Sequence, residues 1–238
     1  MALRIIHSLF FYFLTGLSFV IGTTLTLLLV PFSKSKARSF QTAAHLWARF
    51  LALFSGVRVK VSGLKSIPQD RPVIFAANHQ GMSDILIALA FLPVGFRFAI
   101  KNELFKVPFF GWYLKMAGYF SIDRKMVLSA YRTVDKIVEI VKEGESVLLF
   151  PEGTRTKTGE IGKLKRGSLL AALKSGAPII PVAISGSYNI LPRGSWVIRP
   201  HPVKVGVGKP IYIRSEADYE SKVKEVREAI SKMLQGKA

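Results

Sequence analysis

The sequence lacks cysteine and is poor in acidic residues. Without cysteine the chain can form no disulfide, no thiolate nucleophile and no thiolate metal site, so any nucleophile or base must be an oxygen or nitrogen group. Asp and Glu together number 15 against 34 Lys and Arg, which gives the 238 residues a formal charge of +19. Such an excess of positive charge predicts a polyanionic partner, either nucleic acid or an anionic membrane surface.

The first part of the chain has no acidic residue before Asp70, and residues 5–33 include no charged residue at all. A helix over residues 5–30 would be about 39 Å long at about 1.5 Å per residue, which exceeds the roughly 30 Å hydrocarbon core of a bilayer. We therefore predict that this segment spans a membrane with tilt. A cleaved signal peptide is the alternative, but the apolar run is longer than usual for one and no A-x-A-like cleavage site follows it.

A second apolar stretch, residues 43–57, is interrupted by His45 and Arg49 and is too short to span a bilayer comfortably. It is predicted to form an interfacial or re-entrant helix, so that residues 1–56 make a two-helix membrane anchor. The positive-inside tendency places the basic residues between the two stretches, and with them the rest of the chain, on the cytoplasmic face of the cell membrane. These basic residues are Lys34, Lys36 and Arg38.

Residues 57–238 alternate between short β-branched runs and helical patterns. The predicted strands are residues 57–61, 73–77, 96–100, 119–122, 147–150, 179–184 and 203–207. The predicted helices are residues 84–91, 109–117, 126–141, 164–175 and 217–234. This alternation predicts a single α/β domain with a central mixed, partly parallel sheet flanked by helices.

Of the four histidines, His79 is the one placed for chemistry, because it follows a predicted strand at the sheet edge where α/β proteins hold their sites. Ser83 is the predicted N-cap of the next helix, with Asp84 in its first turn. The five-residue offset can bring the Asp84 carboxylate to one imidazole nitrogen of His79 and leave the other as a general base. Spacing alone also allows a structural alternative, in which Asp84 only starts a helix and His79 is a satisfied edge histidine.

A second polar group follows the predicted strand at 147–150. There, Glu152 and Arg155 lie on a glycine-containing turn, and arginine suits bidentate binding of phosphate. Lys101 and Arg124 also come just after predicted strands, so the three cations are expected to converge on the sheet edge that holds His79. The structural alternative for this segment is a solvated turn with a surface ion pair.

These segments resemble the four ordered sequence blocks of the glycerolipid acyltransferase family. The blocks are Asn78-His79 with Asp84 five residues after the histidine, residues 118–124, residues 150–155 and residues 180–183. Within the family, the sequence resembles the bacterial 1-acyl-sn-glycerol-3-phosphate acyltransferases, which convert lysophosphatidic acid to phosphatidic acid in phospholipid synthesis. One block alone is a weak signal, whereas four in order at suitable spacing are specific.

The resemblance implies roles for individual residues. His79 would be the general base and Asp84 the partner that orients it, while Arg124 and Arg155 would hold the phosphate of the acceptor. Lys101 lies outside the four blocks, and its phosphate-binding role is inferred from its charge and position alone. The residues implied to shape the acceptor site are Asn78, Glu152, Gly153 and Thr154.

The implied reaction needs no covalent acyl-enzyme, because a thioester donor is already activated. The protein must deprotonate the acceptor hydroxyl, orient the two substrates and stabilise the oxyanion, for which the backbone N–H groups after His79 are the candidates. The expected co-substrate is acyl-acyl carrier protein or acyl-coenzyme A, with no cofactor and no metal. Ser121 and Thr156 depart from the usual family pattern, which leaves details of the acceptor open.

Two other functions stay open at this point. The first is an acyltransferase with another acceptor, such as glycerol 3-phosphate or a lysophospholipid with a larger headgroup. The second is a membrane-tethered nucleic-acid-binding protein, although the sequence has no RNA- or DNA-binding motif and no aromatic stacking platform. The expected partners are therefore anionic membrane lipids, lysophosphatidic acid and an acyl carrier protein or coenzyme A thioester.

Overall fold

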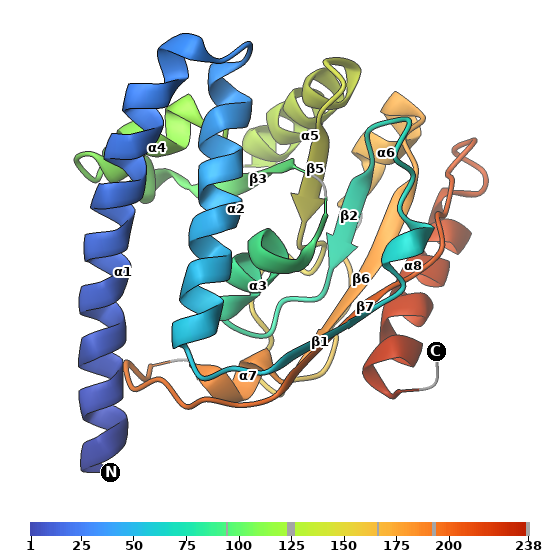
Figure 1. Ribbon diagram of the computed structural model, residues 1–238. Coiled ribbons are helices and arrows are strands. Elements are labelled where there is room, and N and C mark those ends of the chain that lie inside the picture. Colours follow the sequence, from blue (N-terminus) through green and yellow to red (C-terminus); the bar gives the residue numbers. More distant parts are fainter. Residues whose placement is uncertain (94, 123–126, 166, 192–193, 237–238) are drawn as a thin grey trace.

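The computed structural model of the chain describes residues 1–93, 95–122, 127–165, 167–191 and 194–236. Seven strands form one sheet in the order β1-β7-β6-β2-β5-β3-β4 (Figure 1). The strands are β1 (Val59–Ser62), β2 (Ile74–Ala77), β3 (Phe96–Lys101), β4 (Phe120–Ile122), β5 (Ser146–Leu149), β6 (Ile179–Ser185) and β7 (Val203–Val207). All seven lie within two residues of their predicted positions, so the strand prediction is confirmed.

The sheet is mixed, as predicted. Five neighbouring strands, β6, β2, β5, β3 and β4, run parallel to one another. β7 is antiparallel to β6, and the edge strand β1 is parallel to β7. Because the carboxyl ends of the five parallel strands share one edge, the segments that follow these strands come together there.

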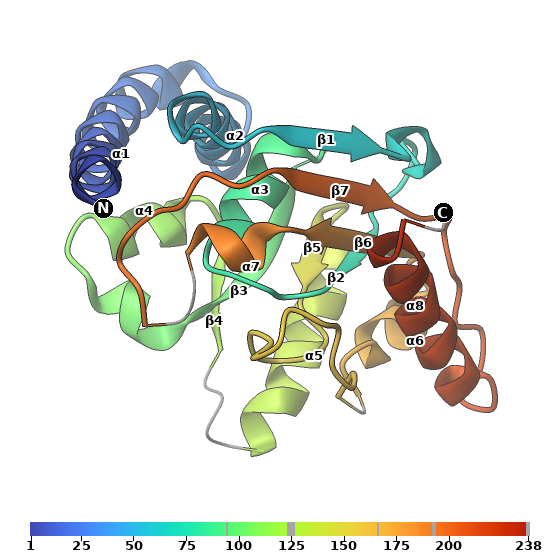
Figure 2. The same cartoon turned by 90° about the horizontal axis from the view of Figure 1, so that it is seen from below.

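Helices cover both faces of the sheet (Figure 2). One face is covered by α2 (Lys36–Phe54), α3 (Ser83–Phe91) and α4 (Phe110–Met116), and the other by α5 (Val127–Lys142), α6 (Leu170–Ser175) and α8 (Tyr219–Leu234). The central strand β2 is buried on both sides, with Phe75 on the first face and Ile74 on the second. Strands covered on both faces are apolar throughout, which is why β2 has no polar position before it ends.

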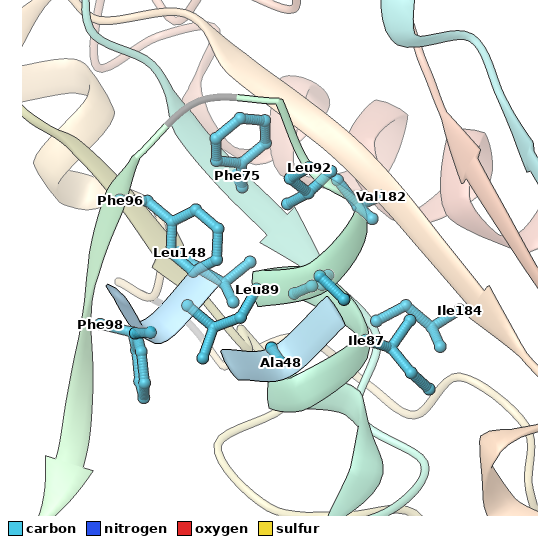
Figure 3. Packing of buried hydrophobic residues seen from close by; sticks show 14 of the residues in the cluster. Ala48, Phe75, Ile87, Leu89, Leu92, Phe96, Phe98, Leu148, Val182 and Ile184 are labelled. Carbon is cyan, nitrogen blue, oxygen red and sulfur yellow. The ribbon is translucent and has the colours of Figure 1, made fainter. Parts of the chain in front are cut away.

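The first face is packed by large side chains from strands and helices together. Figure 3 shows Phe75 and Leu148 of the sheet beside Leu89 of α3 and Ala48 of α2. The small side chain of Ala48 allows α2 to lie close to α3, since it is buried at this contact. This packing holds α3, and hence the turn that precedes it, at a defined position above the sheet.

The helix predictions are confirmed apart from two regions. The second N-terminal helix is predicted over residues 43–57, but α2 begins at Lys36 with Ser35 as its N-cap, so Lys36 and Arg38 lie within the helix and not before it. The predicted helix at residues 164–175 is wrong over its first six residues, because α6 begins only at Leu170. Gly167 has a positive φ of 83°, and the backbone N–H of Lys165 bonds the carbonyl of Pro151 instead of a helical partner. The sequence analysis also missed the short helix α7 (Ser187–Ile190) and the 3-10 turns η1 (Val30–Phe32), η2 (Leu64–Ser66) and η3 (Asn102–Lys106).

The N-terminal helix α1 (Ala2–Leu29) continues into η1, and together they are long and apolar enough to cross a membrane. The best 18-residue window has a mean hydropathy of 2.0, and only 11% of it is buried within the protein. Phe19 of α1 packs edge-on against Trp47 of α2, with ring centroids 5.6 Å apart. The backbone N–H of Ile198 donates to Ser8 Oγ at 2.8 Å, which ties α1 to the α/β part of the chain.

The second N-terminal helix belongs to the same packed structure as the sheet. Phe40, Ala44, Ala48 and Leu51 of α2 are buried in the cluster that covers the first face. His45 Nδ1 contacts the carbonyl of Leu89 in α3. The proposed division into an anchor over residues 1–56 and a catalytic domain over 57–238 stays a prediction, as does the interfacial position of α2.

Candidate active site

The turn after β2 is fixed to the neighbouring strand by Asn78. The side-chain amide of Asn78 donates to the carbonyl of Ile184 at 2.9 Å, and its Oδ1 accepts from the Ile184 N–H at 2.7 Å. Asn78 is only 1% exposed, so its buried side-chain amide forms these two bonds in place of hydrogen bonds to water. Asn78 therefore extends the β2–β6 pairing by one step and sets where the following residue leaves the sheet.

His79 and Asp84 are in direct contact, as the spacing predicted. Asp84 Oδ2 lies 2.7 Å from His79 Nδ1, and the Asp84 side chain is fully buried. A carboxylate at this position favours the tautomer in which Nδ1 carries the proton, which leaves the lone pair on Nε2. The arrangement can therefore accept a proton at Nε2 while Asp84 stabilises the imidazolium that results.

Two expectations about the turn are wrong. Ser83 is not the N-cap of α3, because the helix begins at Ser83 itself and Met82 occupies the cap position. The backbone N–H groups of Gln80 and Gly81 donate to Asp84 Oδ2 at 2.7 and 2.9 Å, so they are not available to an oxyanion. Asp84 thus shapes the turn as well as holding the imidazole.

The turn after β5 packs around His79. Glu152 Oε1 accepts from the His79 N–H at 2.8 Å, and the N–H of Thr156 donates to the His79 carbonyl at 2.8 Å. The ring of Phe150 stacks on the imidazole, with centroids 4.0 Å apart and planes 20° apart. His79 is therefore held by its backbone on both sides and by one face of its ring.

Glu152 serves the structure of the site. It is buried, and its second oxygen accepts from the Gly162 N–H at 2.8 Å. Both oxygens are used by backbone donors, so the carboxylate joins the β2 turn to the segment that follows β5. Gln80, which the sequence analysis did not single out, acts similarly: its Nε2 donates to the Gly159 carbonyl and its Oε1 accepts from Ser187 Oγ at 3.3 Å.

The predicted cations have different surroundings. The guanidinium of Arg155 follows the Glu152 turn and has no hydrogen-bond or ion-pair partner within the described residues. Lys101 is 65% exposed at the end of β3 and pairs with Glu103 at 3.2 Å. Arg124 lies outside the described residues. Thr154 is exposed beside Arg155.

A further cation, Lys165, lies over this turn and was not anticipated. A Cβ atom added to Gly153 would lie 2.6 Å from Cε and 2.8 Å from Nζ of Lys165. The end of the lysine side chain therefore occupies the space where any other residue at position 153 would have its Cβ atom. The Lys165 backbone holds it there through the bond to Pro151 at 2.9 Å. Its ammonium has no partner in the described part of the chain. The sequence feature that could have indicated Lys165 is its place as a basic residue in the glycine-rich segment that follows β5.

Gly153→Ala should weaken the site without unfolding the protein. Gly153 has a φ of 70°, so alanine adds backbone strain of about 1–2 kcal/mol, and it also displaces Lys165. Gly176→Ala is a matched control, because Gly176 has the same φ of 70° but open space where its Cβ would be. Both variants should lose similar stability in urea unfolding, while only Gly153→Ala should lose affinity for an anionic substrate. If the two variants had the same KM for an anionic substrate, the position of Lys165 would play no part in binding that substrate.

An apolar cavity of about 190 Å³ adjoins the His79 turn. Met82 of the turn lines it together with α3, which begins at Ser83, and residues of α1, α2 and α7 complete the lining, among them Phe11, Leu51 and Ile190. Its surface is mostly apolar, which suits a hydrocarbon chain. The site thus combines a histidine–aspartate pair, cations without a partner among the described residues and an adjoining apolar cavity.

A larger cavity of about 570 Å³ is not part of this site. Residues that precede β2, β3 and β5 line it, including Arg71, Gly95 and Glu145. It therefore lies at the amino ends of these strands, whereas His79 and Glu152 follow their carboxyl ends. Among the described residues, no group of three or more His, Cys, Asp or Glu side chains could hold a metal ion.

The chain was compared with known proteins by family and by sequence. A family model described as Acyltransferase matches residues 58–185, which include His79, Asp84 and Glu152. A chloroplastic 1-acyl-sn-glycerol-3-phosphate acyltransferase of Brassica napus is 34% identical over 189 residues, which are 79% of this chain and 54% of that protein. The enzyme of the same name from Pseudomonas aeruginosa is 31% identical over 89% of this chain and 82% of its own length. The chain thus spans about half the length of the plant relative and most of the bacterial one.

A solved structure is also similar. The crystal structure of the 1-acyl-sn-glycerophosphate acyltransferase PlsC from Thermotoga maritima matches with a TM-score of 0.85 and 28% sequence identity. The match covers 98% of this chain and 95% of the other. It therefore includes the two N-terminal helices as well as the sheet.

Proposed function

The chain belongs to the acyltransferase family, and we propose that it transfers a fatty acyl group from an acyl thioester to the sn-2 hydroxyl of lysophosphatidic acid, giving phosphatidic acid. The observation that carries this proposal is the buried His79–Asp84 pair, between whose two members in the chain Met82 and Ser83 lie in the lining of an apolar cavity. The named relatives act on this acceptor, and their similarity extends over most of the chain.

In the proposed reaction, His79 Nε2 takes the proton of the acceptor hydroxyl as the hydroxyl oxygen attacks the thioester carbonyl. The new C–O bond forms a tetrahedral oxyanion, and its collapse breaks the C–S bond. The imidazolium returns the proton to the departing thiolate, so the enzyme ends in its starting state. Asp84, 2.7 Å from Nδ1, stabilises the imidazolium during the interval between the two transfers.

The acceptor phosphate is proposed to bind Arg155 and Lys165. Both lie on the segment that wraps His79, and the ammonium and guanidinium groups have no other partner in the described ranges. Arginine can hold a phosphate with two parallel hydrogen bonds, while lysine contributes a point charge. Arg124 remains a proposed third contact, and the ion pair with Glu103 makes Lys101 a weaker one.

Arg155→Ala and Lys165→Ala should each raise KM for lysophosphatidic acid by about tenfold or more, because a hydrogen bond to a charged group is worth roughly 1.5–3 kcal/mol. The KM for the acyl donor should stay unchanged. Lys163→Ala is the control, since Lys163 is an exposed cation of the same segment that lies over no glycine of the turn. Steady-state kinetics with each substrate varied would check this. Equal increases in both KM values would point to a folding defect.

The apolar cavity is proposed to receive an acyl chain, and the donor to be acyl-acyl carrier protein or acyl-coenzyme A with no further cofactor. The long exposed α1 indicates membrane association. We place the catalytic edge on the cytoplasmic side, where anionic lipids would also attract the basic residues of the chain.

The test is product analysis with the full chain in lipid vesicles. A labelled acyl donor is offered with lysophosphatidic acid, with glycerol 3-phosphate and with a lysophospholipid of larger headgroup, and mass spectrometry identifies the products. We expect phosphatidic acid from the first acceptor and little product from the others. If another acceptor is acylated in preference, acyl transfer is supported but lysophosphatidic acid is not the acceptor. If no product forms with acyl-acyl carrier protein or with acyl-coenzyme A, both the proposed reaction and the proposed acceptor are wrong.

A further inference from the structure

An exposed apolar surface lies on the segment from η3 to α4, and none of its residues takes part in the proposed reaction. Leu104, Val107 and Trp112 are 42%, 44% and 42% exposed, and Phe109 is 84% exposed. We call these four residues the η3–α4 knob. A solvated loop seldom carries four large apolar side chains in so short a stretch. An exposed apolar surface of this kind indicates that another molecule or a membrane covers it.

The knob is built at a cost in backbone strain. Phe109 is the only residue other than glycine with a positive φ within the described ranges, at φ 60° and ψ −51°. The N–H of Phe110 donates to the carbonyl of Pro108 at 2.6 Å, which makes Phe109 the centre of a strained γ-turn. Strain of this kind persists where function requires it, and here it holds an aromatic ring out in solvent.

The knob is also rigidly supported. A Cβ atom at Gly111 would lie 2.1 Å from the carbonyl oxygen of Phe105, so η3 packs directly on the first turn of α4. The N–H of Gly111 bonds the carbonyl of Val107 at 2.7 Å. Because these contacts are short and involve backbone atoms, the segment presents Phe109 at a defined position.

The knob is continuous with the N-terminal helix. Phe110, next to Phe109, packs on Phe19 of α1 with ring centroids 5.5 Å apart, and Tyr113 packs on the same ring at 5.1 Å. Both views place α4 and the loop before it beside α1 (Figures 1 and 2). Around Phe19, the α1 residues Val20 and Ile21 are 61% and 51% exposed. The knob therefore extends the apolar surface of α1 onto the α/β part of the chain.

We propose that the η3–α4 knob inserts into the interface of a lipid bilayer beside α1 and forms a second membrane contact. Two exposed lysines accompany it: Lys106 lies between Leu104 and Val107, and Lys115 follows Trp112 on α4. Neither has an ion-pair partner within the described part of the chain, so they can contact anionic headgroups. Because the knob follows the carboxyl end of β3, its insertion brings the edge of the sheet that holds His79 against the leaflet surface. This goes beyond the proposed acyl transfer and does not depend on it.

The absence of cysteine allows a direct test with the full chain. Phe109→Cys and the control Tyr131→Cys are each labelled with an environment-sensitive dye, since Tyr131 is 60% exposed on α5. With vesicles of phosphatidylglycerol and phosphatidylethanolamine, we expect a blue shift at position 109 and quenching by brominated acyl chains, with neither at position 131. If aqueous iodide still quenches the dye at position 109 when vesicles are present, the proposal is overturned. The proposal is also overturned if the dye is shielded from iodide without vesicles, because a second copy of the chain would then cover the position.

A second variant separates insertion from folding. Phe109→Gly removes the ring and also relieves the positive φ, so its unfolding temperature should be equal to or above that of the unchanged protein. Its partition onto the same vesicles should fall about tenfold, since burying a phenylalanine side chain is worth roughly ten- to hundredfold in such a constant. The control Tyr131→Ser should partition normally. Unchanged partition of Phe109→Gly would contradict the proposal, and no readout uses acyl transfer.

Discussion

Replacing His79 with alanine should lower kcat for acyl transfer by about 10²- to 10⁴-fold, the usual contribution of a general base. The KM values should change little, because the proposed phosphate contacts and the apolar cavity do not depend on the imidazole. The backbone of residue 79 keeps its bonds to Glu152 and Thr156, so the turn should stay folded. Single-turnover kinetics with a labelled donor, together with thermal unfolding, would check both points.

His201→Ala is the control for this experiment, since His201 is exposed and its ring nitrogen hydrogen-bonds only the side chain of Asn189 among the described residues. It should leave kcat unchanged. A His79→Ala protein that turned over at a near-normal rate would remove the base from the proposed mechanism, even if the reaction itself were confirmed.

Replacing Asp84 should affect both activity and stability, and two variants separate the effects. Asp84→Ala leaves the buried N–H groups of Gln80 and Gly81 without an acceptor, which should cost roughly 1–3 kcal/mol for each group in the free energy of unfolding. Asp84→Asn keeps an oxygen acceptor but removes the charge that stabilises the imidazolium. It should therefore stay closer to normal stability while losing activity by up to the same factor as His79→Ala.

The double variant His79→Ala/Asp84→Ala gives the sharper result. Residues that act as one unit are not additive, so the double variant should lose no more activity than His79→Ala alone. Additive losses would mean that Asp84 acts independently of His79. Asp218→Ala is the control for stability: backbone hydrogen bonds from Ser215 and Arg214 hold the pKa of Asp218 below its usual value, yet this carboxylate is exposed. Its removal should cost less stability and no activity.

The charge of the chain can now be assigned to particular places. In the proposed function, Arg155 and Lys165 neutralise a substrate phosphate at the His79 turn. Lys106 and Lys115 lie in and next to the η3–α4 knob, Lys34 lies between η1 and α2, and Lys36 is the first residue of α2. The four lysines face lipids in the proposed arrangement, so an anionic membrane and a phosphate-bearing substrate together account for part of the excess of positive charge without a nucleic acid.

Local sequence was sufficient for the strands and for the His79–Asp84 contact. Buried strands are short runs of β-branched and other apolar residues, and a five-residue offset across one turn limits where Asp84 can lie relative to His79. The same reasoning failed at residues 164–169, where the apolar and basic pattern suits a helix. There a tertiary bond from Lys165 to Pro151 and the positive φ of Gly167 decide the conformation.

The roles of Glu152 and Lys165 depended on long-range contacts that no spacing rule predicts. Glu152 binds the backbone of His79, 73 residues away in the chain, and Lys165 lies over Gly153. Gln80 likewise joins Gly159 and Ser187. Such contacts form only when the sheet order brings β2, β5 and β6 side by side.

The sequence by itself determined the α/β class, the apolar N-terminal helix and the contact between His79 and Asp84, because each depends on residues close together in the chain. Only the tertiary structure decided that Glu152 clamps the His79 backbone, that the N–H groups of Gln80 and Gly81 serve Asp84, and that Phe109 is held outward beside α1. The physical reason is that strand order and helix packing set which backbone donors meet which carboxylates, and a linear pattern of residue types does not contain that order.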